Sequence, residues 1–398
     1  MSKKIDSVIQ SYVDNREISG GAMIIRKGGQ IVYQNKWGWA DLAAQTPIDD
    51  TSIFRMMSMT KPITAVGILK LMESGLLCLD DPISKFLPQF SNMRVSCDKR
   101  YVYKPSMNMA LLLLKLPFFR MEKVKTEPAK REITILDLLS HCSGLEQGIV
   151  GFMAMAKDKQ KVSDLSQQMN KFSHWALGFQ PGTDTGYSPR AGFDVLTRII
   201  EIVSGMDAAS YFQTEIFDPL EMTDSFFWPD DAQRKRIVKA YRRKTDTLVD
   251  VTGTKDDMYG MLACEEAYIA GCGGLFSTLS DYDHFVQMLS NGGSYNSIQL
   301  LKPETIQLMH TEAPEKHMEP DPGQVWGLGV KIRQDPVKGK LPVTAGTYGW
   351  SGAFGTHFFI SPVDNLSCVW MTNRTDLGGS GSYISAKIEE LVFEEFKE

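Results

Sequence analysis

Segments with the composition of β-strands occur near both ends of this chain, and a long stretch of helical pattern separates them. The first two form a hairpin, because the turn Lys27-Gly28-Gly29 joins two runs of strand-forming residues. Strands from opposite ends of a chain pair most simply in one antiparallel sheet. The predicted strands are residues 22–26 and 30–36 near the N-terminus, and residues 325–332, 356–360 and 366–371 near the C-terminus.

Amphipathic helices are predicted at both termini, where they can pack on this sheet. Ile5, Ile9 and Val13 recur at helical spacing within residues 1–14, and Tyr383–Phe396 shows the same periodicity. The region between the end strands contains the remaining predicted helices and one short strand. These helices are residues 62–74, 134–140, 191–204 and 281–289, and the short strand is residues 275–278.

The pattern predicts an α+β protein with a discontinuous sheet domain and an inserted, mainly helical domain. We expect the sheet domain to comprise residues 1–80 and 262–398, and the helical domain to comprise residues 81–261. Residues 91–132 are expected to form a partly apolar surface excursion.

Composition excludes several classes of protein. The chain has 398 residues, 43% of them hydrophobic, and a net charge of −5, so it can bury a large core and offers no basic surface for nucleic acid. No run approaches the roughly 18 apolar residues of a membrane span. The first 14 residues lack the apolar stretch of a signal peptide, and the six cysteines are scattered, which favours a reducing, cytoplasmic location.

No metal or cofactor is expected from the sequence. Neither the cysteines nor the six histidines have the spacing of metal ligands, and nucleotide-binding loops are absent. Gly271-Cys272-Gly273-Gly274 lacks dinucleotide-binding spacing and is predicted to be a tight turn. The sequence leaves the oligomeric state open.

The pattern Ser-x-x-Lys occurs twice, and its context separates the two copies. Ser96 and Lys99 lie in a polar stretch without helical periodicity, whereas Ser58 lies where the helix before Pro62 begins. Positions i and i+3 of a helical turn share a face, so Lys61 is expected to place its amine beside the Ser58 hydroxyl. A serine needs a neighbouring base to act as a nucleophile, which makes Ser58 the candidate. An ordinary helix-start serine is the alternative for Ser58 taken alone.

A second motif, Phe179-Gln180-Pro181-Gly182-Thr183-Asp184-Thr185-Gly186-Tyr187-Ser188-Pro189, precedes the helix 191–204. With these segments the chain resembles the serine β-lactamase and penicillin-binding-protein superfamily, in its class C-like branch, and within it the β-lactamase-like carboxylesterases of family VIII. The resemblance implies a five-stranded antiparallel sheet, terminal helices, an inserted helical domain and an active site at their junction. Further segments that match are residues 50–61, 133–145, 273–278 and 326–329.

The resemblance also assigns roles to individual residues. Tyr187 stands at the family's catalytic tyrosine, and Ser58 and Ala353 would supply the backbone N–H groups of an oxyanion hole. The strand that carries the family's Lys-Thr-Gly box has another tripeptide here, and it is expected to contact substrate. That tripeptide is Trp350-Ser351-Gly352. Arg374, just after the last strand, is a further substrate-binding candidate.

Two positions depart from the pattern of many β-lactamases. Pro189 stands where they have asparagine, so no side-chain amide is available to hold an acylamide. Trp350 stands where they have lysine, and an indole cannot pair with a carboxylate. Both departures favour ester chemistry over efficient penicillin hydrolysis, and the indole suits an apolar acyl chain.

The sequence therefore predicts a serine hydrolase that forms an acyl-enzyme on Ser58, with Lys61 and Tyr187 moving the proton. A carboxylesterase that acts on small esters is expected, with transfer of the acyl group to another alcohol as a variant. A β-lactamase or D-aminoacyl peptidase with the same residues is one alternative, and its substrate would be a small amide. A non-catalytic penicillin-binding or sensor module is an alternative of another class, which an intact Ser58, Lys61 and Tyr187 argues against.

Overall fold

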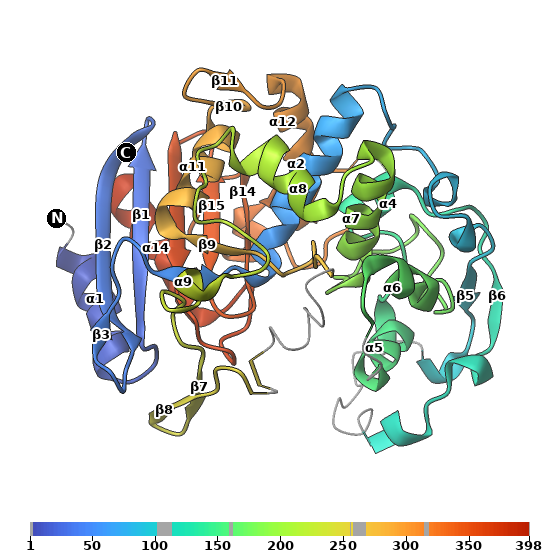
Figure 1. Cartoon of the computed structure of the whole chain (residues 1–398), viewed down its shortest axis with the longest axis horizontal. Helices are drawn as coiled ribbons and strands as arrows, with labels where there is room; N and C mark the ends of the chain where they lie inside the picture. Colours follow the sequence, from blue (N-terminus) through green and yellow to red (C-terminus); the bar gives the residue numbers. More distant parts are fainter. Residues whose placement is uncertain are drawn as a thin grey trace.

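The computed structural model describes residues 3–101, 114–158, 162–254, 256–257, 268–313 and 318–397. One large antiparallel sheet is built from both ends of the chain, and helices cover it (Figure 1). Its strand order is β12-β13-β14-β15-β16-β1-β2-β3. The strands are β1 (Gly20–Lys27), β2 (Gln30–Asp41), β3 (Thr46–Pro47), β12 (Gln324–Trp326), β13 (Lys331–Arg333), β14 (Thr347–Ser351), β15 (His357–Ser361) and β16 (Leu366–Met371).

The two chain ends meet where β1 pairs with β16, with Ala22 opposite Met371. This pairing confirms that the N-terminal and C-terminal strands share one antiparallel sheet. The expected count of five strands is wrong, because eight strands lie in this sheet within the described residues. The increase comes from a two-residue edge strand, β3, from β14, and from the division of residues 325–332 into two strands.

Residues 325–332 were expected to form a single strand, and they form the hairpin β12–β13 instead. Gly329 has a φ of +75°, and a Cβ at this position would lie 2.7 Å from the Cβ of Ala65. The turn therefore requires glycine both for its left-handed backbone and for its close packing on the helix below. Val330 accepts a backbone hydrogen bond from Gly327 across the turn.

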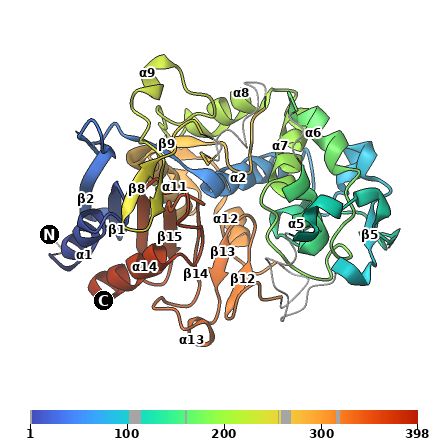
Figure 2. The same ribbon diagram turned by 90° about the horizontal axis from the view of Figure 1, so that it is seen from below.

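Both faces of the sheet are covered, and alternate residues of the central strands belong to different cores. On β1, Met23 and Ile25 pack with the terminal helices, whereas Ala22 and Ile24 face the main core. This separation follows from the two-residue period of a strand. Helices α1 (Lys3–Asp14) and α14 (Tyr383–Phe396) lie on one face, and α11 (Leu279–Ser290) lies on the other (Figure 2). The two predicted terminal helices are confirmed.

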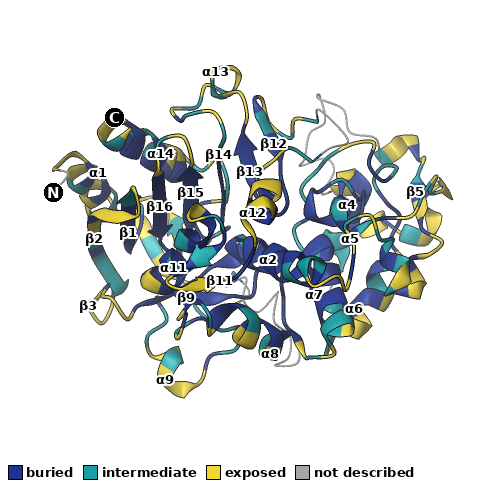
Figure 3. Ribbon diagram, turned by 90° about the horizontal axis from the view of Figure 1, so that it is seen from above, coloured by how far each residue is buried: buried dark blue, intermediate teal, exposed yellow. Residues whose placement is uncertain are grey.

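Helix α2 (Thr60–Glu73) runs through the middle of the molecule and is buried along most of its length (Figure 3). It packs against α7 (Ala191–Ser204), which ends at Gly205 in the left-handed conformation, as the sequence predicted. The remaining α-helices of the described residues are α4 (Ile135–Leu139), α5 (Gly148–Lys157), α6 (Leu165–Phe172), α8 (Ala208–Phe212), α9 (Asp231–Arg234), α12 (Pro303–Met309) and α13 (Pro336–Gly339).

Short strand pairs complete the described structure. They are β4 (Ile53–Arg55) with β9 (Phe276–Thr278), β5 (Arg94–Ser96) with β6 (Thr126–Pro128), β7 (Tyr241–Lys244) with β8 (Thr247–Asp250), and β10 (Ser294–Tyr295) with β11 (Ile298–Gln299). The β5–β6 pair belongs to the predicted excursion 91–132, of which residues 102–113 lie outside the described ranges. The division at residues 81 and 262 into two domains stays a prediction. None of the helices described is long and apolar enough to cross a membrane.

Candidate active site

Ser58 lies on the short 3-10 helix η1 (Met57–Met59), which leads directly into α2. Met57, the residue before it, has a φ of +52°, a left-handed backbone that a non-glycine residue adopts at some cost in free energy. Lys61, in the first turn of α2, places its Nζ 3.3 Å from the Ser58 Oγ. The predicted geometry of the Ser-x-x-Lys motif is therefore present.

Tyr187 reaches the same serine from the loop before α7. Its hydroxyl donates a hydrogen bond of 2.6 Å to the Ser58 Oγ. The Lys61 Nζ lies 5.0 Å from the centre of the Tyr187 ring, close enough for a cation–π interaction. The structure thus brings Tyr187 to Ser58 and Lys61, although Tyr187 and Ser58 are 129 positions apart in the sequence.

Lys61 is completely buried, and backbone carbonyls hold its ammonium group. The Nζ donates to the carbonyl of Pro189 at 2.8 Å and to that of Cys272 at 2.7 Å. With Ser58, these acceptors match the three donors of an ammonium group. At Pro189, where the sequence analysis noted the missing side-chain amide, a main-chain oxygen binds the lysine. The role of Cys272 was not foreseen, although its turn was.

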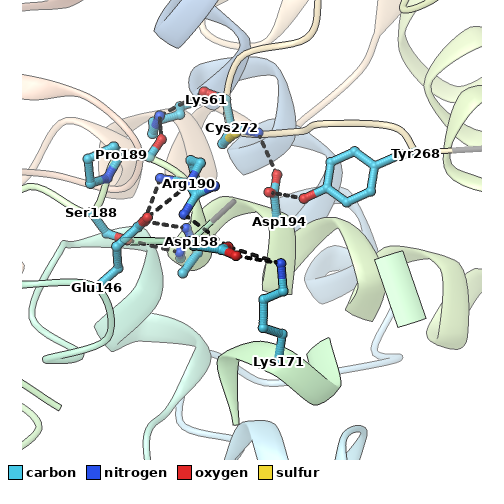
Figure 4. A network of polar contacts seen from close by, with 12 residues as sticks. Lys61, Glu146, Asp158, Lys171, Ser188, Pro189, Arg190, Asp194, Tyr268 and Cys272 are labelled. Carbon is cyan, nitrogen blue, oxygen red and sulfur yellow. Dashed lines mark hydrogen bonds and ion pairs between the residues drawn. The ribbon is translucent and has the colours of Figure 1, made fainter. Parts of the chain in front are cut away.

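A buried carboxylate holds the loop that carries Tyr187 and Pro189 (Figure 4). Glu146 accepts hydrogen bonds from the backbone N–H groups of Arg190 and Ala191, both at 2.7 Å, and from the Ser188 Oγ at 3.2 Å. Its side chain is fully buried and also pairs with the Arg190 guanidinium at 3.0 Å. These N–H groups form the start of α7, where a negative charge is favourable.

Asp194 on α7 holds the turn at Cys272, whose carbonyl binds Lys61 (Figure 4). It accepts hydrogen bonds from the Tyr268 hydroxyl at 2.6 Å and from the Cys272 N–H at 3.2 Å. Burial raises the pKa of Asp194 to about 6, although these hydrogen bonds act in the opposite direction. The backbone of Cys272 is therefore held at both polar groups: its N–H donates to Asp194, and its carbonyl accepts from Lys61.

His141 packs beside the catalytic candidates as a neutral acceptor. Burial, together with the charges of Lys61 and Lys331, lowers the pKa of His141 well below its usual value. Its Nδ1 accepts a hydrogen bond from the Ser188 N–H at 3.2 Å, and its ring centre lies 5.0 Å from that of Tyr187. The sequence analysis found no metal-ligand spacing among the histidines, and His141 packs next to the site.

A cavity of about 410 Å³ opens onto Ser58. Among the predicted residues, its lining includes Ser58, Tyr187, Trp350, Ser351 and Ala353. Trp326 and Trp350 make a T-shaped contact in it, with ring centres 4.8 Å apart.

Gly352 lies where the end of β14 approaches the nucleophile turn. A Cβ there would lie 2.3 Å from the carbonyl oxygen of Met56, so only glycine permits this contact. The predicted oxyanion hole at the N–H groups of Ser58 and Ala353 stays a prediction.

Ser351 connects the cavity to a chain of buried polar groups behind β14. Its Oγ lies 2.8 Å from the His357 Nδ1, and the His357 Nε2 lies 3.2 Å from Glu389 on α14. Burial alone would raise the pKa of Glu389, but Arg333 and His357 hold it down to about 2. Glu389 is therefore ionised and links the C-terminal helix to the strands of the site.

Arg374 is not brought to the cavity. Its guanidinium binds Asp376 at 3.0 Å, the carbonyl of Glu17 at 3.0 Å and the hydroxyl of Tyr383 at 3.0 Å. These contacts hold it near the C-terminal helix, away from the residues that line the cavity.

A cation does reach the cavity, from a residue that the sequence analysis did not select. The Lys331 Nζ lies 5.1 Å from the ring centre of Trp326 and 5.3 Å from that of Trp350, and it pairs with Asp321 at 2.5 Å. On a single strand, Trp326 and Lys331 would point to opposite faces. The β12–β13 hairpin pairs them directly, so recognising that turn would have revealed the contact.

Comparisons with known proteins agree with this architecture. The sequence pattern of the protein family described as Beta-lactamase matches residues 5–392. Esterase EstB of Burkholderia gladioli is 24% identical, over 96% of this chain and 92% of that protein. A putative D-alanyl-D-alanine carboxypeptidase of Escherichia coli (strain K12) is 26% identical, over 93% of this chain and 82% of that protein. The structure of EstCE1, described as a hydrolase with promiscuous acyltransferase activity, superposes with a TM-score of 0.77 at 24% identity, covering 98% of both chains.

Proposed function

Because this chain belongs to the Beta-lactamase family, we propose that it is a serine hydrolase that forms an acyl-enzyme on Ser58 and acts as a carboxylesterase. One observation carries the proposal. The Ser58 Oγ lies within 2.6 Å of the Tyr187 hydroxyl and 3.3 Å of the Lys61 Nζ, at the edge of a cavity that can hold a small molecule. A nucleophile, two proton-transfer groups and a binding space therefore meet at one atom.

The proposed reaction begins with attack of the Ser58 Oγ on the ester carbonyl. As the new C–O bond forms, the hydroxyl proton passes to Tyr187, which accepts it in its phenolate form beside the Lys61 ammonium group, and the carbonyl electrons move to the substrate oxygen. The N–H groups of Ser58 and Ala353 would stabilise that oxyanion. Collapse of the intermediate expels the alcohol, which takes up the proton.

The second half of the reaction repeats these steps in reverse order. A water molecule, or the hydroxyl of another alcohol, gives its proton to Tyr187 and attacks the acyl carbon. Ser58 then leaves as a hydroxyl. The indole rings of Trp326 and Trp350 line the cavity and support an apolar acyl chain as the group that is bound.

Two observations support an ester over a β-lactam as the substrate. Pro189 offers the site a carbonyl that Lys61 already binds, and it has no side-chain amide. Relatives of this chain include a protein named as an esterase. The relative named as a putative D-alanyl-D-alanine carboxypeptidase supports the amide-cleaving alternative, which the same three residues could serve.

A panel of p-nitrophenyl esters of increasing chain length, measured beside nitrocefin, tests the proposal. We expect kcat/KM for the short-chain esters to exceed that for nitrocefin by at least ~10²-fold, equal to about 2.7 kcal/mol of transition-state binding. A nitrocefin value equal to that of the butyrate ester would favour the β-lactamase alternative. A fluorophosphonate probe that labels the native protein no more than Ser58→Ala would favour the non-catalytic module.

A reducing, cytoplasmic setting is part of the proposal. Cys78 and Cys97 carry exposed free thiols, which such a compartment preserves.

A further inference from the structure

The ammonium group of Lys331 is held in the wall of the cavity by two indole rings and one carboxylate. The rings of Trp326 and Trp350 lie 5.1 and 5.3 Å from its Nζ, and the Asp321 carboxylate lies at 2.5 Å. All four side chains line the space that opens onto Ser58. An ion pair is therefore built into the cavity lining beside two indole rings.

The two members of this ion pair differ in exposure. The side chain of Lys331 is 6% exposed, whereas that of Asp321 is 52% exposed. Leaving this ammonium group without a polar partner would be costly, and in the described residues Asp321 is its ion-pair partner. Asp321 can turn into water with little loss, because solvent replaces its partner.

Exchange of one carboxylate for another is therefore the favourable event at this position. A ligand carboxylate that displaces Asp321 would keep Lys331 paired and would leave Asp321 hydrated. The backbone makes the position rigid, because Lys331 is paired with Trp326 on β12 and with Gly349 on β14. Lys331 is therefore held in place, and Asp321 is the partner that a ligand carboxylate can replace.

We propose that Lys331 binds a carboxylate of the substrate, so that the preferred substrates are esters that carry a free carboxylate in addition to the ester bond. This inference rests on the proposed esterase function. It also revises the interpretation of Trp350, because the cation absent from that position is supplied by the neighbouring strand. The indole of Trp350 then supports the ammonium group through its π face.

The experiment compares esters that differ only in charge. The substrates are the mono-p-nitrophenyl esters of adipic and pimelic acid, each measured against the same compound with its free carboxylate capped as a methyl ester. 4-Acetoxybenzoate and its methyl ester form a second pair, in which the charge lies on the leaving alcohol. The quantity measured is the ratio of kcat/KM for the charged ester to that for the capped one.

We expect the native protein to prefer the charged member of at least one pair, and that pair shows whether the carboxylate belongs to the acyl or the alcohol part. Lys331→Met should lower the ratio by about tenfold or more, as for a lost charge-assisted hydrogen bond. Lys331→Arg should keep most of the native preference for the charged ester. Asp321→Asn should raise the ratio, because it removes the carboxylate that competes for Lys331. Lys235→Met, at an exposed position outside the cavity, is the matched control and should leave the ratio unchanged.

Three outcomes would overturn the inference. One is a ratio that is the same in the native protein, Lys331→Met and Asp321→Asn. Another is a native preference for capped esters. The third, measured with a further pair in which an amine replaces the carboxylate, is a preference for the amine, which would assign the site to Asp321. If Lys331→Met does not fold, the ratios measured for Lys331→Arg and Asp321→Asn still test the inference. Failure of the proposed function is separate, because the native protein would then hydrolyse neither ester faster than Ser58→Ala does.

Discussion

At the scale of single residues, Ser58 is defined by what surrounds its hydroxyl. The Oγ accepts a hydrogen bond from Tyr187 at 2.6 Å and has the Lys61 Nζ at 3.3 Å. The other Ser-x-x-Lys serine, Ser96, lies on strand β5, where its N–H binds the carbonyl of Leu177. The same four-residue pattern therefore has different consequences on a helical turn and on a strand.

Ser58→Ala should abolish turnover of p-nitrophenyl esters while the protein stays folded. Removal of a covalent nucleophile lowers kcat by on the order of 10⁶-fold in a serine protease, and a comparable loss is expected here. Initial rates and circular dichroism of the purified variant measure both properties. Ser96→Ala is the control and should keep its rate. A Ser58→Ala protein with a tenth of the native rate would exclude Ser58 as the nucleophile.

Tyr187→Phe should fold normally and lower kcat by roughly 10²–10⁴-fold, the range for a positioned acid or base. The substitution removes the hydroxyl and keeps the ring that packs between His141 and Trp350. Lys61→Ala should be at least as damaging. An unchanged rate in Tyr187→Phe would assign the proton transfer to Lys61 alone.

At the scale of elements, the start of α7 positions the site. Glu146 caps this helix through the N–H groups of Arg190 and Ala191. The loop just before these residues contains Tyr187 and also Pro189, whose carbonyl binds Lys61. Glu146 contacts neither Ser58 nor the cavity, so it acts through the loop as a positioning residue.

Glu146→Gln keeps the shape of this side chain and removes its charge. The amide group of glutamine would face N–H donors, so we expect a loss of about 1–3 kcal/mol in the free energy of unfolding and a lower kcat, with KM changed less. Urea unfolding and steady-state kinetics provide the two measurements. Glu127→Gln, at an exposed position on β6, is the control. A loss of stability with no change in kcat would show that the cap does not position Tyr187.

At the scale of the whole molecule, a buried acid makes stability depend on pH. Burial raises the pKa of Asp194 to about 6, whereas an unfolded chain releases this proton near its ordinary value of about 3.9. Between these values the native state holds a proton that the unfolded state has lost. The contribution to stability is therefore complete below about pH 4 and decreases as the pH rises through 6.

Asp194→Asn removes this titration. We expect the free energy of unfolding of the variant, relative to the native protein, to rise between pH 4 and pH 7 by up to about 3 kcal/mol and then to level off. Urea unfolding at half-unit intervals of pH measures the difference. A constant difference over this range would mean that Asp194 has an ordinary pKa in the folded protein.

The local elements were predictable because their signals lie within short windows of sequence. Helical spacing of apolar residues identified α1, α7 and α14, and Gly205 marked the end of α7. The adjacency of Ser58 and Lys61 is also local, since one helical turn places i beside i+3. The position of Tyr187 came from resemblance to a family, because no local rule relates it to a serine 129 residues away.

The tertiary structure alone decided which distant groups complete the site. Lys61 binds the carbonyl of Cys272, 211 positions along the chain, and only packing brings a turn of unremarkable sequence to that lysine. Lys331 lies in the cavity because residues 325–332 form a hairpin at Gly329, although their composition is that of a single strand. Arg374 lies outside the cavity because it binds Tyr383 on α14. Sequence encodes periodicity and turn chemistry locally, but pairing and burial depend on contacts between segments that no short window contains.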